Sequence, residues 1–223
     1  EAAAASEKSG EGRKVTFSVF VDSMWRKIKP RKEEHDIDPA LVWTEIKSYI
    51  KGSSEALRAD DAAQSQGLDA TKRLAKQKDA YMNLGKKVGT VTMAQREQVW
   101  EYYLSYEQKK KLMSCWDEGD LVLDLYKRLK RHGPCGILIH QAFIDEVQDF
   151  TPTEVQVLMG CLDRNKSITL AGDTQQHVMQ EAGFTSWTEF FDHLGVEGTA
   201  VDTLRVAYRS SAQIVTFARH LLG

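Results

Sequence analysis

The pattern of apolar and polar positions predicts two similar strands in the C-terminal half of the chain. Residues 137–149 begin as an almost continuous apolar run and end in three carboxylates. Residues 167–176 repeat this plan, because a short β-rich run leads into a Gly-Asp turn followed by amide side chains. Apolar runs of this length are typical of strands that are buried on both faces of a parallel sheet.

The segment between these two runs has the spacing of a helix. Its apolar residues are Val155, Val157, Leu158 and Leu162, and Thr-Pro-Thr-Glu at 151–154 provides a helix start. If both strands share one sheet, the order strand, helix, strand forms a β-α-β crossover. The polar ends of both strands then meet at one edge of the sheet.

The middle of the chain is predicted to be helical. Apolar residues keep helical spacing in 39–50, after an Asp-Pro start, and in 94–112. Residues 52–70 are rich in Gly, Ser, Ala and Asp, and we expect a loop there. Near the C-terminus, residues 214–222 form an amphipathic segment.

The carboxylates after the first strand suggest a chemistry. Ligands bind outside the carboxyl ends of parallel strands, so Asp145 and Glu146 would face a crevice. ATPases of the P-loop type hold Mg²⁺ and polarise the attacking water with such a pair. We expect Asp145 to coordinate Mg²⁺ through water and Glu146 to orient or deprotonate the water that attacks the γ-phosphate. A strand followed by an acidic turn is the plainer alternative.

Several short stretches, taken in series, resemble motifs of the UvrD/Rep-like branch of superfamily 1 helicases. Asp-Glu-Val-Gln-Asp at 145–149, Gly-Asp-Thr-Gln-Gln at 172–176 and Tyr-Arg-Ser at 208–210 resemble motifs II, III and IV. Residues 14–20 look like motif Ib, with Ser where that family commonly has His, and residues 116–122 are similar to the helix start before motif II. The sequence of the predicted helical segment resembles the divergent UvrD-like cores found in large multidomain ATPases.

The resemblance implies an α/β fold, a partial RecA-like P-loop NTPase domain with a parallel sheet and an inserted helical subdomain. It also implies a division of the chain. Residues 1–12 would be a disordered or truncated end, 13–32 part of the first RecA-like domain, 33–115 a helical 1B insertion, 116–205 the remainder of the first RecA-like domain, and 206–223 the start of the second.

Carried over residue by residue, the resemblance assigns roles in ATP hydrolysis. Asp145 would bind magnesium, Glu146 would be the catalytic base, Gln176 would sense the γ-phosphate, Arg209 would be an arginine finger and Tyr208 would stack on the adenine. The planar guanidinium of arginine suits the phosphate oxygens of the transition state. A surface salt bridge for Arg209 and a core aromatic for Tyr208 are the plainer alternatives.

Contacts with single-stranded nucleic acid would involve Thr16, Phe17 and Trp187. Trp187 follows the motif III glutamine at a longer interval than is usual, so Phe184 is an alternative, or both residues anchor a helix at 186–194. The net charge of −2 does not indicate a nucleic-acid binder. Basic runs that could contact phosphates, or that mark solvated helix faces, lie at 26–32, 109–111 and 127–131.

The sequence departs from the family in its phosphate-binding loop. No Gly-x-x-x-x-Gly-Lys-Ser/Thr occurs, and residues 83–89 have the wrong spacing. We therefore interpret the chain as an inactive fragment of an ATP-dependent helicase or translocase that moves along single-stranded nucleic acid, DNA rather than RNA. Its missing partners would be the P-loop and the second RecA-like domain. The alternatives are a motor that remodels a complex such as stalled RNA polymerase, a degenerate interaction module, and a pseudoenzyme that has lost its P-loop.

Length and composition indicate the size of the core and the cellular environment of the protein. At 223 residues and 42% hydrophobic, the chain can bury one good core and a second, smaller one. Cys115, Cys135 and Cys161 have no metal-type spacing and suit a reducing interior. Neither a signal peptide nor a membrane span is evident. We expect an intracellular protein, cytoplasmic if bacterial and nuclear if eukaryotic.

Overall fold

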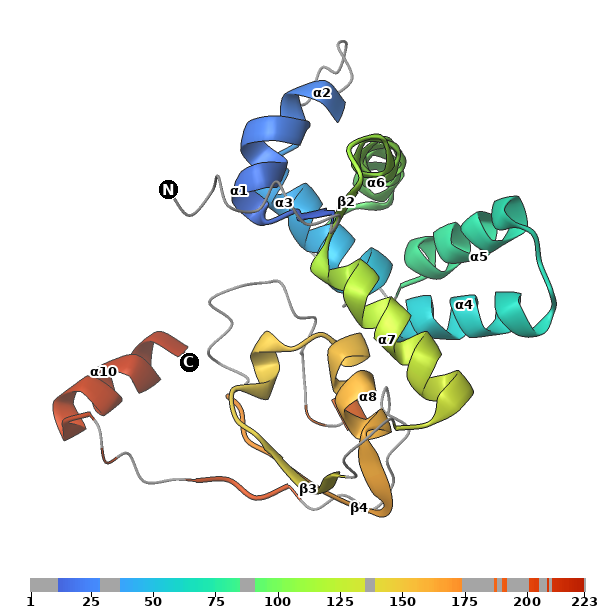
Figure 1. The fold of residues 1–223 in the computed structure, drawn as a ribbon. Coiled ribbons are helices and arrows are strands. Elements are labelled where there is room, and N and C mark those ends of the chain that lie inside the picture. Colours follow the sequence, from blue (N-terminus) through green and yellow to red (C-terminus); the bar gives the residue numbers. More distant parts are fainter. Residues whose placement is uncertain are drawn as a thin grey trace, which may run out of the picture.

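The computed structural model describes residues 12–28, 37–84, 91–134 and 139–173, and beyond these 187, 190, 191, 201–204, 208 and 210–222 (Figure 1). The order of elements is β1 (Arg13–Lys14), α1 (Phe17–Val19), η2 (Phe20–Trp25), α2 (Arg26–Ile28), α3 (Pro39–Thr44), η3 (Glu45–Lys51), α4 (Ser54–Ser65), α5 (Ala70–Met82), α6 (Met93–Leu112), β2 (Cys115–Trp116), α7 (Glu118–His132), β3 (Ile139–Ile144), η4 (Val147–Asp149), α8 (Pro152–Gly160), β4 (Leu162–Leu170) and α10 (Ala212–Leu222).

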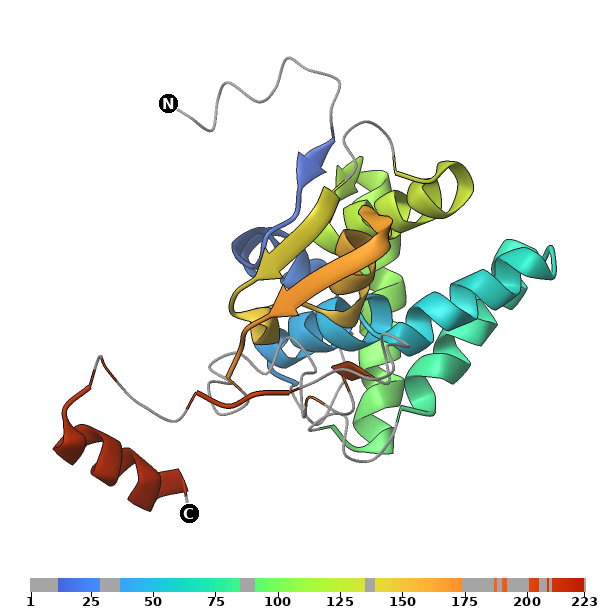
Figure 2. The ribbon, with the colours of Figure 1, turned by 90° about the horizontal axis from the view of Figure 1, so that it is seen from below.

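The predicted β-α-β arrangement is confirmed. β3 and β4 pair in parallel, from Ile139 opposite Leu162 to Ile144 opposite Leu170, and α8 connects them. Figure 2 shows the two strands side by side, with their arrowheads at the same edge. The residues that follow Ile144 and Leu170 are therefore neighbours.

Two details of this prediction were wrong. The helix ends at Gly160, and Leu162 is the first residue of β4 instead of the last apolar residue of the helix. β4 thus begins five positions before residue 167. Leu162 is 5% exposed, and burial against β3 explains why its apolar character fitted both readings.

The helical middle contains a large aromatic core. Its buried members come mainly from η2, η3 and α6. η2 and η3 are π-helices that directly continue α1 and α3. The residues buried to 2% exposure or less are Val15, Phe20, Met24, Val42, Ile46, Ile50, Tyr81, Val99, Trp100, Tyr102 and Tyr106.

The loop predicted at 52–70 is wrong over most of its length. Residues 54–65 form α4, which lies against α5, and the two helices project together from the rest of the molecule in Figure 1. Ser53 caps α4 by accepting a hydrogen bond from the Ala56 N–H at 3.2 Å. The segment is rich in serine and aspartate, which favour both helix caps and loops, and Ala56 and Ala63 are buried on the inner side of the helix.

A smaller core lies beside the second sheet. Ile144, Val147, Val155 and Phe190 are its buried members, and Ile168, Leu170 and Met159 pack against it. α8 thus covers the face of the sheet that carries Ile144. On the other face, Phe143 is 72% exposed and Ile139 is 40% exposed.

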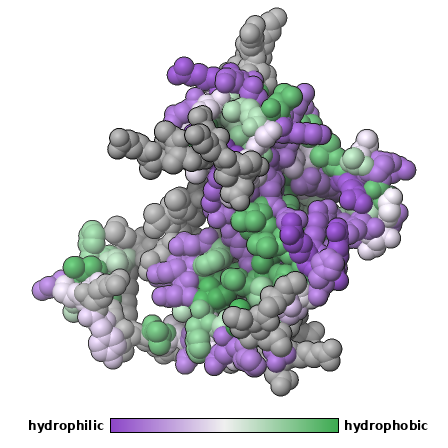
Figure 3. All heavy atoms as spheres, viewed as in Figure 1, coloured by the Kyte–Doolittle hydropathy of each residue, from purple (hydrophilic) through white to green (hydrophobic). Residues whose placement is uncertain are grey.

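Apolar residues also lie on the surface of the molecule. Figure 3 shows apolar residues gathered over β3 and along the contact between α7 and α8. α10, predicted from its amphipathic spacing, forms at 212–222, with Ile214 and Phe217 exposed. Among the described residues, no helix combines the length and apolarity needed to span a bilayer.

Candidate functional site

The carboxylate pair lies in the turn that follows β3. Asp145 and Glu146 are both exposed, whereas Val147, the next residue, is fully buried. Glu146 has φ 51° and ψ 43°, in the left-handed region that a glutamate seldom adopts. Its N–H donates to Asp145 Oδ1 at 3.0 Å. This conformation turns both carboxylates outward at the end of the strand.

The turn is tied to the end of β4. The Ala171 N–H donates to the Ile144 carbonyl at 2.8 Å, and the Val147 N–H donates to the Ala171 carbonyl at 2.9 Å. The backbone of predicted motif II is therefore joined to Ala171, the residue directly before predicted motif III. Such bonds hold Glu146 in its unusual conformation, because the residues on both sides of it are fixed.

The side chain of Gln148 adds a second link. This residue is 5% exposed, its Nε2 donates to Glu146 Oε2 at 2.5 Å, and its Oε1 accepts from the Asp173 N–H at 3.1 Å. Gly172 leaves space for this amide, since a Cβ there would lie 2.7 Å from Gln148 Oε1 and 2.9 Å from Val147 Cγ1. Gln148 lies within predicted motif II, and the sequence indicated no role for it.

The acidic turn suits a magnesium ion. Mg²⁺ is commonly bound by one or two carboxylates, with water and substrate phosphates completing its octahedral shell. Asp145 offers an exposed carboxylate beside Glu146 and next to the end of β4, so the donors fit such an ion. When bound, the metal would neutralise charge on the phosphates.

The other predicted ATP-site residues are not all placed. Gln176 and Arg209 lie outside the described residues. Tyr208 is 94% exposed, so its ring is in solvent and does not pack as a core aromatic. Of the five assigned residues, the structure brings together Asp145 and Glu146.

Trp187 packs against the smaller core. Its ring lies 5.7 Å from Phe191 in a stacked arrangement and 6.3 Å from the ring of Phe190, which is 3% exposed. This position accords with the anchoring alternative for Trp187.

Thr16 and Phe17 line a pocket of about 470 Å³ at the start of α1. Phe17 is 43% exposed, and its ring lies 6.2 Å from that of Trp43 in α3. Lys14 and Lys47 also line the pocket. Asp117 and Glu118 line the pocket as well, and Lys14 lies 3.7 Å from Glu118. The two aromatic rings and Lys47 are the features that suit a planar ring attached to an anionic backbone. Trp43 lies in residues 33–115, the predicted helical insertion, where an aromatic residue at helical spacing can be core or can stack on a base.

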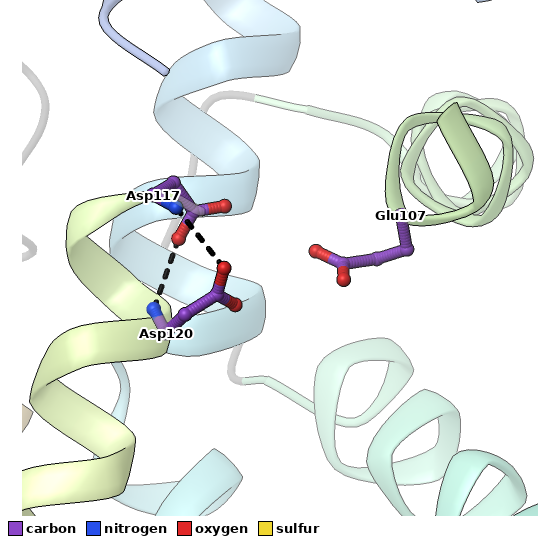
Figure 4. A group of neighbouring side chains, drawn as sticks. All are labelled: Glu107, Asp117 and Asp120. Carbon is purple, nitrogen blue, oxygen red and sulfur yellow. Dashed lines mark hydrogen bonds between the residues drawn. The ribbon is translucent and has the colours of Figure 1, made fainter. Parts of the chain in front are cut away.

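A buried charge cluster lies next to this pocket. Figure 4 shows Asp117 and Asp120 at the start of α7, with Glu107 of α6 directed toward them. The three carboxylates lie within 4.8 Å of one another, a spacing that could hold a metal ion. Here the ammonium groups of Lys51 and Lys110 each contact all three carboxylates, at 2.6–2.8 Å. Protein cations therefore occupy the place that a metal would need.

Burial and charge act in opposite directions in this cluster. Burial favours the neutral forms, but the carboxylates outweigh it for Lys51 and raise the pKa of that ammonium well above 10.5. Burial also raises the pKa of Asp117, whereas Lys51 and Lys110 lower it more strongly, and the net pKa lies below 3.8. Lys51 and Asp117 are thus both charged near neutral pH.

The cluster connects the helical middle to the start of α8. Thr153 donates its N–H to the Gly52 carbonyl at 3.1 Å and its hydroxyl to the Lys51 carbonyl at 3.2 Å. Gly52 permits the approach, since a Cβ there would lie 2.8 Å from Thr151 Cγ2. Lys51 therefore reaches α6 and α7 with its ammonium and α8 with its carbonyl. The Asp-x-x-Asp capping box of α7 was a sequence signal for Asp117, but nothing local marked Lys51 as its partner.

Comparison with known proteins defines the class. Residues 13–180 match the UvrD/REP helicase N-terminal domain, and the chain belongs to this family. Because of this membership, the protein is helicase-related. Proteins of the UvrD/REP helicase family generally use ATP and Mg²⁺. It is also 31% identical over 170 residues to human TPR and ankyrin repeat-containing protein 1. That match covers 76% of this chain and 5% of the relative. No solved structure matches the chain.

Proposed function

We propose that this chain is part of a larger ATP-driven motor that moves along single-stranded nucleic acid. The carrying observation is the outward-facing pair Asp145 and Glu146, fixed at the end of β3 by bonds to the end of β4. A rigid carboxylate pair at this position suits phosphoryl transfer, in which positioning and charge stabilisation supply most of the catalysis. Family membership supports the same conclusion.

In the proposed reaction, Glu146 acts on the attacking water. As the water oxygen bonds to the γ-phosphorus, its proton passes to the Glu146 carboxylate. The bond from the γ-phosphorus to the bridging oxygen breaks, its electron pair stays on ADP, and phosphate leaves. Asp145 would hold the magnesium ion, while Gln176, Arg209 and Tyr208 would contact the γ-phosphate and the adenine. Closure of the cleft between two RecA-like domains would couple each turnover to one step.

The phosphate-binding loop of this motor would lie in another part of the full-length protein. The 223 residues contain no Gly-x-x-x-x-Gly-Lys-Ser/Thr sequence, and the chain spans about 5% of the length of the curated relative it matches. We therefore expect the chain by itself to bind ATP weakly and to lack hydrolytic activity. Residues 33–115 would serve as the helical insertion, and residues 206–223 as the start of the second RecA-like domain.

The pocket beside α1 is the proposed contact for the nucleic acid. Phe17 and Trp43 offer ring faces on which a base could stack, and Thr16 and Lys47 line the same pocket and would contact the backbone. A base that stacks on an aromatic side chain contributes about 1–3 kcal/mol to binding. The net charge of −2 does not favour DNA over RNA, and we propose DNA, as expected from the sequence.

The test is ATP hydrolysis by the full-length protein with and without oligonucleotides. We expect single-stranded DNA to stimulate hydrolysis more than duplex DNA does, and an assay of strand displacement then separates unwinding from movement without unwinding. Stimulation by RNA but not by DNA would show that the motor moves along RNA. Hydrolysis that no nucleic acid stimulates would contradict a translocating motor.

A further inference from the structure

We propose that Gln148 is the positioning residue for Glu146 and that it connects the catalytic carboxylate to the turn after β4. The inference rests on the proposed function. It assigns to Gln148 a role in setting the geometry of hydrolysis, through hydrogen bonds to Glu146 and to the backbone of Asp173.

The two hydrogen-bond partners of Gln148 fix the orientation of its amide. An ionised carboxylate can only accept and a backbone N–H can only donate, so the orientation of the amide is fixed by its partners. Nε2 must face Glu146 and Oε1 must face Asp173, as the structure has them. Glutamine satisfies both partners at once, whereas glutamate would present an acceptor to the carboxylate and a hydrocarbon side chain would bond to neither.

Gln148 and Glu146 differ in burial. Gln148 is 5% exposed, and Val147 beside it is fully buried, whereas Glu146 is exposed. An exposed glutamate samples several rotamers, and each wrong rotamer moves its carboxylate away from the water. The buried amide therefore provides a fixed point for a side chain that would otherwise move. Because Gln148 bonds Oε2, it leaves Oε1 of Glu146 to accept the proton.

The amide oxygen of Gln148 is bonded to the turn after β4. Asp173 begins the polar stretch that continues to Gln176, and Gly172 provides the space in which the amide lies. Any displacement of the Asp173 backbone would act on Gln148 Oε1 and, through the same rigid amide, on Glu146. Gln148 is thus placed to make the catalytic carboxylate respond to the turn after β4.

The test compares four forms of the full-length protein in nucleic-acid-stimulated ATP hydrolysis. They are the wild type, Gln148→Met, Glu146→Gln and the control Gln141→Met, which changes an exposed glutamine of β3. We expect Gln148→Met to lower kcat by roughly 100-fold, the cost of misplacing a reacting group by about 1 Å, and to leave KM for ATP unchanged. The control should retain the wild-type kcat and KM.

A second readout does not depend on activity. Hydrogen–deuterium exchange at the Asp173 amide should become faster in Gln148→Met and remain slow in Glu146→Gln, because Glu146→Gln keeps the bond from Gln148 to Asp173. If Gln148→Met fails to fold, Gln148→Asn keeps the amide but shortens its reach by one methylene, and it should show the same loss of kcat.

The outcomes separate the two proposals. Wild-type hydrolysis no faster than that of Glu146→Gln would refute the proposed function, whatever the exchange data show. An active wild type with an unchanged kcat in the folded Gln148 variants would overturn the positioning role alone. A rise in KM at unchanged kcat would also overturn it, because Gln148 would then serve nucleotide binding.

Discussion

Replacement of Lys51 by methionine should destabilise the protein strongly. Lys51 is 3% exposed, and its ammonium lies 2.7 Å from Asp117, 2.8 Å from Asp120 and 2.7 Å from Glu107. Methionine fills similar space without the charge. The cluster would then hold three carboxylates against the single ammonium of Lys110, with Asp117 itself only 4% exposed.

The expected magnitude follows from this geometry. Removing one partner of a buried ion pair costs about 3–5 kcal/mol, because the remaining charge is neither solvated nor neutralised. Lys110 at 2.8 Å and the Tyr106 hydroxyl at 2.9 Å still bond to Asp117, which places the expected loss near the lower end of that range. For a chain of this size, the loss corresponds to a fall in melting temperature of roughly 6–12 °C.

The assay is urea denaturation near pH 7, with Lys72→Met as the matched control. Lys72 is 68% exposed in its side chain and lies 3.6 Å from Asp69, so its replacement should change stability by less than about 0.5 kcal/mol. A loss below about 1 kcal/mol for Lys51→Met would refute the reasoning, because it would mean that water solvates Asp117 despite its burial in the structure.

The pH dependence of this cluster has a definite sign. The folded pKa of Asp117 is lowered, so its stabilisation is present above its ordinary pKa of 3.8 and is lost as the pH falls below that value. The folded pKa of Lys51 is raised, so its stabilisation is present below 10.5 and is lost as the pH rises through the folded pKa. The difference between wild type and Lys51→Met should therefore be largest between about pH 4 and 10.5 and should shrink in stronger acid.

Two further variants test other parts of the structure. Tyr81→Phe removes the hydrogen bond from the Tyr81 hydroxyl to Glu45 Oε2 at 2.7 Å. Because Glu45 is 1% exposed, we expect urea denaturation to show a loss of about 1–3 kcal/mol in the free energy of unfolding. An unchanged midpoint would show that Glu45 is neutral or has another donor. Thr151→Ala removes the cap of α8, where Thr151 and Glu154 bond reciprocally, and should cost about 1 kcal/mol, whereas Thr151→Ser should restore most of it; equal losses in both would contradict a capping role.

The sequence predicted the second sheet well because its signals are local. The apolar run before Asp145 and the β-rich run that ends at Leu170 each predict a strand, and the structure pairs the two in parallel. The predicted burial on both faces was wrong for β3, since Ile144 is its one buried residue and Phe143 is 72% exposed. Thr151 and Pro152 mark the start of α8 unambiguously, and the structure has its first turn there. The placement of Asp145 and Glu146 beside the end of β4 then follows from the topology.

Other features depend on contacts that no local pattern contains. Lys51 and Asp117 are 66 positions apart, and each sequence neighbourhood resembles an ordinary solvated helix end. The helix at 54–65 was mistaken for a loop because serine, glycine and aspartate also favour loops, whereas its burial against α5 is decided by tertiary packing. Likewise, the bond between Gln148 and the Asp173 amide depends on the register of β3 with β4.

The most direct test of the central claim is ATP hydrolysis by the full-length protein. Phosphate release is measured with saturating single-stranded DNA, for the wild type and Glu146→Gln side by side. Glu146→Gln replaces the proposed base with a neutral side chain of the same shape. The account predicts stimulated hydrolysis in the wild type and its loss in the variant, with ATP binding retained. Equal background rates in both proteins would contradict it and would favour a degenerate interaction module.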